Sequence, residues 1–179
     1  MTPNSEIRRN ADFDELYARY GREVWAVAYS RRMDRDAAMD IAQESFLRLW
    51  NEREKGTEIL NPRGWLIRVA RNLADDMAKS AFRRHGTTAT NAMDGYRSAA
   101  KPPDVKLLQD ETFACVRAVM EELSVPDRDI LTLRYALDYD SPKIAEILEI
   151  PVTSVHMRLS RARKRLAEKF SERGVEPLS

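Results

Sequence analysis

The chain has 179 residues, of which 30 are Lys or Arg and 29 are Asp or Glu, so its formal net charge is only +1. Its mean hydropathy is −0.56, and no run approaches the roughly 20 apolar residues of a membrane span. The polar N-terminus has no apolar signal-peptide core, and a single cysteine, Cys115, excludes an internal disulfide. These features predict a cytoplasmic protein with no membrane span and with one large or two small domains.

Residues that support catalysis or metal binding are scarce. His85 and His156 lie far apart in the sequence, and one cysteine cannot build a cysteine-rich zinc site. The chain also lacks a glycine-rich phosphate loop and a Cys/His pair with local support. The sequence therefore predicts no catalytic residue, no metal site and no cofactor, and an enzyme is the least favoured class of protein.

Apolar residues recur at helical spacing along most of the chain, without sustained two-residue alternation. In the first half this pattern predicts a three- or four-helix bundle, with one helix starting near Asp34 or Asp36 and another at Pro62 after an Asn61 cap. Residues 86–106 are small and polar and include two adjacent prolines, which indicates a flexible interdomain linker. We expect an all-α protein with two small helical domains, residues 1–85 and 107–179.

The second half is punctuated by capping residues. Helices are predicted from Leu107 and from Ser124, followed by a short helix capped at Asp140 or Ser141. Ile150-Pro151 breaks the chain, and a longer helix then runs from Val152 to about Phe170. A short helix, a tight turn and a longer helix are typical of a helix-turn-helix.

Charge is sorted along the chain. The charged side chains of residues 104–149 are mainly acidic, whereas residues 152–173 carry seven basic side chains and two acidic ones. The predicted helix from Pro62 is also basic. Two basic helices in two domains suggest two contacts with one polyanion. The alternative for the last helix is a solvated face that complements the helix dipole.

The predicted turn favours the DNA-binding alternative, because Val155 and Leu159 fit core positions of a helix-turn-helix. The residues that then project outward, where base edges are reached, are Thr153, Ser154, His156, Met157, Ser160 and Arg161. Arg163, Lys164 and Arg165 are expected to meet phosphates or solvent.

Two pairs of motifs carry a resemblance to a known family. Residues 40–50 (DIAQESFLRLW) and 62–76 (PRGWLIRVARNLADD) are similar to the second conserved region of the extracytoplasmic-function sigma factors. Residues 143–148 and 150–166 resemble the fourth region. These proteins are minimal two-domain specificity subunits of bacterial RNA polymerase. A helix-turn-helix motif alone is common. The region 2 motifs followed, after a polar linker, by the region 4 motifs are highly specific for this family.

The resemblance implies that the protein binds core RNA polymerase and directs promoter-specific initiation. In the family, the first motif binds the clamp helices of the largest polymerase subunit, which points here to Asp40, Gln43, Glu44, Arg48 and Trp50. Asp40 and Glu44 lie one helical turn apart, and a polar stripe beside an exposed aromatic suits a protein interface. A plain solvated face is the alternative, and Trp50 fits a core position equally well.

The loop 51–64 and the helix after it match the region that melts and reads the −10 element. The implied DNA-contacting residues are Asn61, Arg63, Arg68, Arg71 and Asn72, with Lys79, Arg83 and Arg84 on phosphates. Aromatic and cationic side chains can offset the cost of unstacking, at about 1–3 kcal/mol per stacked base. Trp65 is expected to be buried, with Leu66, Val69, Ala70 and Leu73 in the core.

The −35 element is assigned to the last helix. The implied contacts with double-stranded DNA are Thr153, Ser154, His156, Met157, Arg158, Ser160 and Arg161. Glu149 and Thr153 stand where relatives often have glycine. His156 and Met157 replace a commoner basic-then-small pair, so the resemblance alone does not give the −35 sequence preference of this chain.

Two other classes of protein share some of these features. A free-standing helix-turn-helix regulator explains residues 107–170 but leaves residues 40–50 and 62–76 without a role. A sigma-like decoy that sequesters an anti-sigma protein has no need of the basic helix 152–165. Relatives are typically held inactive by an anti-sigma domain, so the resemblance is compatible with such a partner, although no residue here identifies one.

Overall fold

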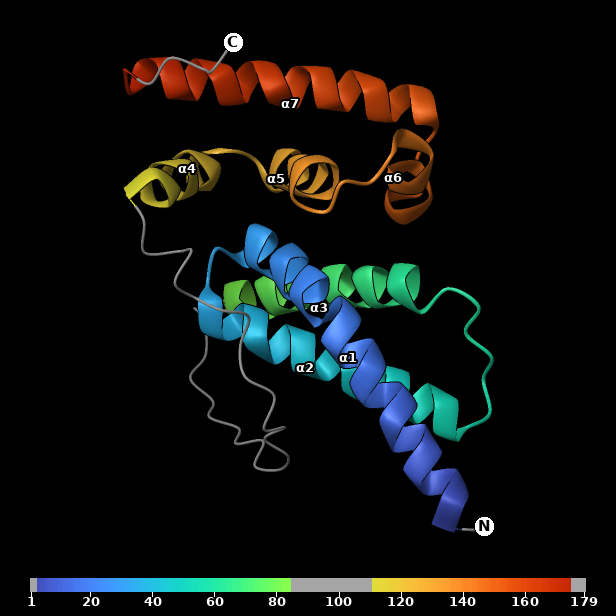
Figure 1. Cartoon of the computed structure of the whole chain (residues 1–179). Coiled ribbons are helices and arrows are strands. Elements are labelled where there is room, and N and C mark those ends of the chain that lie inside the picture. Colours follow the sequence, from blue (N-terminus) through green and yellow to red (C-terminus); the bar gives the residue numbers. More distant parts are fainter. Residues whose placement is uncertain (1–2, 85–110, 175–179) are drawn as a thin grey trace. The chain divides into compact units, whose positions relative to one another are not determined.

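The computed structural model describes residues 3–84 and 111–174, and every regular element in these ranges is helical (Figure 1). The chain divides into two compact units, residues 1–103 and 104–179. The predicted all-α class is confirmed. The division falls inside the predicted linker 86–106, which lies outside the described residues, so the linker itself stays a prediction.

Within residues 3–84, the first unit contains three helices that pack against one another (Figure 1). They are α1 (Pro3–Arg32), α2 (Arg35–Glu54) and α3 (Pro62–Arg84). The Asp34 carboxylate accepts a hydrogen bond from the Ala37 N–H at 2.9 Å and so caps α2, as predicted. Asn61 Oδ1 likewise accepts from the Gly64 N–H at 3.0 Å at the start of α3.

The core of the first unit takes apolar residues from all three helices. Its fully buried side chains include Val24, Val27, Ala28, Ile41, Phe46, Leu49, Leu66, Ile67 and Ala70. Aromatic rings extend this core, because Tyr17 lies 4.7 Å from Phe46 and Phe13 lies 5.1 Å from Trp50 between ring centroids. Three residues expected to be buried are only half-buried, namely Trp65, Val69 and Leu73.

The second unit places its longest helix against the shorter ones (Figure 1). Its elements are α4 (Glu111–Glu122), α5 (Val125–Leu131), the π-helical turn η2 (Thr132–Ala136), α6 (Ser141–Leu148) and α7 (Val152–Glu172). Ser124 and Asp140 are the N-caps of α5 and α6, as their capping chemistry predicts. Helix α7 packs against α4, α5 and α6, so its orientation is set by all three.

The turn between α6 and α7 has a left-handed residue at its centre. Glu149 has φ 55° and ψ 44°, and the Ile150 N–H donates to the Ala145 carbonyl at 3.1 Å. This is the Schellman arrangement that ends a helix, and glycine is the residue it favours. The geometry therefore favours glycine at this position, where this chain has Glu149. The turn leads directly into α7, which confirms the predicted helix-turn-helix.

Candidate nucleic-acid and polymerase interfaces

The first turns of α7 separate a buried face from an exposed one. Val155, Leu159 and Ala162 are buried against the rest of the second unit. Ser154 is half-buried, and the other −35 candidates are exposed, namely Thr153, His156, Met157, Arg158, Ser160 and Arg161. Five of the six residues that were predicted to project outward are therefore exposed, and so is the further candidate Arg158, while their contacts with DNA stay a prediction.

The basic residues of α7 are divided between this exposed surface and contacts inside the fold. Arg165 donates from Nε to Asp127 Oδ2 at 2.7 Å and from Nη2 to Asp127 Oδ1 at 2.6 Å. Arg165 is exposed to solvent, as expected, but its guanidinium also holds α7 to the first turn of α5, a contact that the sequence did not predict. The neighbouring Arg163 and Lys164 are exposed, as expected.

Asp127 is a buried carboxylate with a partner on each side. Burial raises the pKa of the Asp127 carboxyl, but hydrogen bonds from Arg165 and Ser124 lower it by more, so the pKa lies below its ordinary value. Asp127 also lies three residues after the Ser124 cap, the spacing of a capping box. The charged carboxylate thus stabilises the start of α5 and its contact with α7 together.

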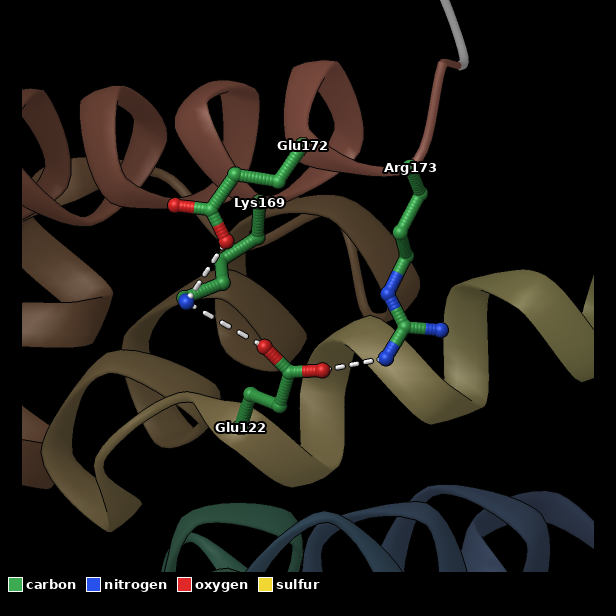
Figure 2. A network of polar contacts seen from close by, with 4 residues as sticks. All are labelled: Glu122, Lys169, Glu172 and Arg173. Carbon is green, nitrogen blue, oxygen red and sulfur yellow. Dashed lines mark hydrogen bonds and ion pairs between the residues drawn. The ribbon is translucent and has the colours of Figure 1, made fainter.

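A second ion-pair cluster joins the end of α4 to the end of α7 (Figure 2). Lys169 Nζ lies 3.2 Å from Glu122 Oε2 and 2.9 Å from Glu172 Oε2, and Arg173 donates to Glu122 Oε1. Hydrogen bonds from Arg173 and Lys169 hold the pKa of the Glu122 carboxyl below its ordinary value. The cations at the C-terminal end of α7 therefore stabilise the fold, whereas Arg158, Arg161 and Arg163, closer to its N-terminus, are exposed.

The polymerase candidates lie on one surface of α2, which we call the α2 face and define as Asp40, Gln43, Glu44, Leu47 and Arg48. Asp40 is exposed and Gln43 is half-buried. Arg48 Nε donates to Glu44 Oε1 at 2.8 Å, an exposed pair one turn apart. Leu47 is 40% exposed, and sequence reasoning did not assign it a role.

Trp50 differs from the other polymerase candidates. Its ring packs edge-on against Phe13 of α1, and the residue is half-buried. This contact agrees with the core alternative stated for Trp50. The α2 face is therefore defined without it, and a polymerase contact by Trp50 stays an untested prediction.

The −10 candidates are distributed around the start and one side of α3. Arg63 donates from Nε and Nη2 to the Glu23 carboxylate of α1 at 2.7 and 2.9 Å, and Asn61 caps α3, so both have structural roles. Arg68, Asn72 and Lys79 share one face of the helix by their spacing, and Lys79 lies 3.8 Å from Asp76. Arg71 is half-buried. The side chains of Arg83 and Arg84 lie outside the described part of the structure.

The turn before α3 exposes an apolar residue that sequence reasoning missed. Leu60 is 88% exposed and directly precedes Asn61. An apolar residue inside the polar stretch 51–61 was the signal that could have identified it. Exposed apolar side chains of this kind insert between base steps in several DNA-bending proteins.

No helix in residues 3–84 or 111–174 is long and apolar enough to cross a membrane. No group of three or more His, Cys, Asp or Glu side chains in those ranges is arranged to hold a metal ion.

Two family models match the two units. A model described as Sigma-70 region 2 matches residues 16–86, and one described as Sigma-70, region 4 matches residues 113–166. The first contains the α2 face and α3, and the second contains the helix-turn-helix. The fold and these matches define a transcription initiation factor of the sigma-70 class. Within that class the chain belongs to the extracytoplasmic-function sigma factors of bacterial RNA polymerase.

Curated relatives include sigma factors from several bacteria. The probable RNA polymerase sigma factor RfaY of Xanthomonas campestris pv. campestris is 33% identical over 154 residues, which cover 84% of this chain and 38% of that protein. The ECF RNA polymerase sigma factor SigL of Mycobacterium tuberculosis is 29% identical over 161 residues, which cover 89% of each chain. The chain thus spans well under half of the first relative's length and most of the second's.

Solved structures with the same fold include two proteins that were determined in complex with another protein. The sigma factor RpoE of Bartonella quintana, in complex with the anti-sigma factor NepR, has a TM-score of 0.64 at 20% identity, with 89% of this chain and 97% of that chain covered. CnrH, in complex with the cytosolic domain of CnrY, also has a TM-score of 0.64, at 22% identity, with 91% and 90% covered. At these identities the likeness shows the fold.

Proposed function

We propose that the protein binds bacterial core RNA polymerase through the α2 face and recognises promoter DNA through α3 and α7. Sigma factors are regulatory proteins that direct promoter-specific transcription, and this chain acts as one of them without a catalytic role of its own. Residues 1–85 form the region 2 domain, residues 107–179 the region 4 domain, and residues 86–106 the linker. The protein works in the cytoplasm, where its polymerase is.

The observation that carries this assignment is the exposed surface of α7. A tight turn after α6 leads into a helix whose buried residues, such as Val155 and Leu159, leave Thr153, Met157 and Arg161 on the outside. A recognition helix in the major groove needs an exposed N-terminal half, with polar and basic side chains that reach base edges. Helix α7 has this arrangement, and α5 and α6 hold it in place.

For the −10 element we propose a surface made of Arg68, Asn72 and Lys79 along α3, with Leu60 at its N-terminal end. Cations along the helix favour the phosphates, and an amide such as that of Asn72 offers donors and acceptors to an unstacked base. Arg63 contributes chiefly by tying α3 to Glu23 of α1.

The direct test is transcription from a genomic fragment library with purified protein and sigma-free bacterial core polymerase. We expect discrete start sites preceded by two shared sequence motifs. Arg161→Ala is expected to weaken −35 recognition, at about 1–3 kcal/mol for a bidentate base contact. Arg163→Ala is the matched control, because it removes the same charge from a different side of α7. If the two variants weaken −35 binding equally, Arg161 contributes only non-specific electrostatic attraction to DNA.

Polymerase binding is tested separately. Replacing Asp40 and Glu44 by alanine is expected to weaken binding to core polymerase, whereas the same charge change at Asp14 and Glu15 of α1 is not. If the first variant binds core polymerase with unchanged affinity, Asp40 and Glu44 face solvent and do not contact the polymerase.

The decoy alternative makes a different prediction from the sigma factor. A decoy binds an anti-sigma protein but neither binds core polymerase nor initiates transcription. Both structural relatives are complexes, one with an anti-sigma factor and one with the cytosolic domain of CnrY. We therefore include an anti-sigma partner in the proposal for this chain. Transcription initiation in the reconstituted system excludes a pure decoy. If the protein does not bind core polymerase, the decoy alternative is supported.

A further inference from the structure

Met157 is an apolar residue in the middle of the exposed surface of α7. It is 54% exposed, whereas Val155 and Leu159 on the other side of the helix are buried. Thr153 and Arg161 lie four residues before and after Met157, so the three side chains share one face. Met157 therefore contributes little to the packing of the second unit, and its side chain is available to a partner.

The chemistry of the major groove limits what an apolar side chain can recognise there. Base edges present hydrogen-bond donors and acceptors, and the one apolar group among them is the C5-methyl of thymine. Methionine offers only a weak acceptor, so a guanine or adenine edge facing it loses water without gaining a partner. Its flexible, polarisable thioether instead adapts to an apolar contact.

The spacing along α7 adds a positional constraint. Met157 and Arg161 are separated by about 6 Å along the helix axis, and successive base pairs by about 3.4 Å. When the helix follows the groove, the two side chains face bases about two steps apart. We infer that Met157 contacts a thymine methyl in the −35 element, about two base pairs from the base contacted by Arg161. This inference rests on the proposed −35 recognition by α7.

The test uses holoenzyme assembled from the full-length protein and sigma-free core polymerase. A −35 sequence is first selected from a random duplex library, and each thymine in it is then replaced by deoxyuridine, which lacks only the methyl group. At one position we expect the wild type to lose about fourfold in affinity, the value of burying one methyl group. Met157→Gln is expected to bind the thymine and deoxyuridine duplexes equally well, whereas the apolar variant Met157→Leu is expected to keep the preference for thymine.

The possible results separate this inference from the proposed function. If a sequence is selected but deoxyuridine has no effect at any thymine, or if Met157→Gln still discriminates, the thymine contact is wrong and the proposed function stands. If Met157→Gln weakens holoenzyme assembly instead of discrimination, Met157 contacts the polymerase, which also overturns the inference. If no sequence is selected, both the proposed −35 recognition by α7 and the thymine contact of Met157 are wrong.

Discussion

Replacing Asp127 by alanine is expected to loosen the packing of α7 without changing the first unit. The Asp127 side chain is 8% exposed and accepts two hydrogen bonds from Arg165, whose side chain is 48% exposed. The same carboxylate lies in the first turn of α5, three residues after the Ser124 cap. The substitution therefore removes the contact between α5 and α7 and part of the α5 cap.

The expected cost follows from the exposure of the two partners. A hydrogen bond to a charged group contributes about 1.5–3 kcal/mol, and breaking a fully buried pair costs about 3–5 kcal/mol. Here the variant also removes the penalty of burying Asp127, and the half-exposed Arg165 regains water. We therefore expect the free energy of unfolding of the second unit to fall by about 2 kcal/mol. In a domain of this size that lowers Tm by roughly 8–16 °C.

The assay exploits the distribution of aromatic residues. All three tryptophans, Trp25, Trp50 and Trp65, belong to the first unit. In urea titrations of the full chain, tryptophan fluorescence therefore follows the first unit, whereas far-UV circular dichroism follows the helices of both. We expect Asp127→Ala to shift part of the dichroism transition to lower urea while the fluorescence transition stays in place.

The matched control is Lys164→Ala on the same helix. Lys164 lies 4.0 Å from Glu168 in a pair whose side chains are both largely exposed, so its loss is expected to change stability little. If Asp127→Ala behaves like this control, the contact between α5 and α7 does not stabilise the second unit. A shift of the fluorescence transition would instead show that the two units unfold together.

Three further predictions concern pH, a turn and a cap. Burial raises the pKa of Asp127, but hydrogen bonds from Arg165 and Ser124 outweigh it and place the pKa below its unfolded value. The charged carboxylate therefore stabilises the second unit fully above about pH 4, and this stabilisation is lost as pH falls through the folded pKa. In urea titrations from pH 6 downward, Asp127→Asn should make the stability of the second unit fall less with pH. Glu149→Gly should raise the stability of the second unit by about 0.5–1 kcal/mol because Glu149 has positive φ, whereas Glu149→Ala, which keeps the β-carbon, should not. Gly64→Ala should destabilise α3 by about 1 kcal/mol in fluorescence-monitored unfolding, because the new Cβ would lie 2.7 Å from Nδ2 of the Asn61 cap; stability equal to wild type would show that the cap adapts.

Local features of the fold were predictable from the sequence. Asp34, Ser124 and Asp140 were all expected at helix starts, and each caps the following helix. A cap is a contact between residues three positions apart, so its chemistry is visible in a short stretch of sequence. The exposed side of α7 was predictable for a similar reason, because helical periodicity separates Val155 and Leu159 from Met157 and Arg161.

The roles of individual cations depended on partners far away in the sequence. Arg63 was assigned to DNA but binds Glu23, which lies 40 residues earlier, and Arg165 binds Asp127, which lies 38 residues earlier. The side of a helix that carries a basic residue follows from spacing, but the acid it meets depends on how the helices pack.

The sequence by itself determined the all-α class, the helix boundaries near the caps, the family and the surface of α7 that points outward. These properties depend on contacts within a few residues or on motifs that lie in one stretch of chain. Only the tertiary structure decided that Arg165, Lys169 and Arg173 hold α7 in place, that Trp50 packs on Phe13, and that Leu47 and Leu60 are exposed. Packing between helices brings distant residues together, and it therefore decides which charges are neutralised within the fold and which apolar side chains remain on the surface.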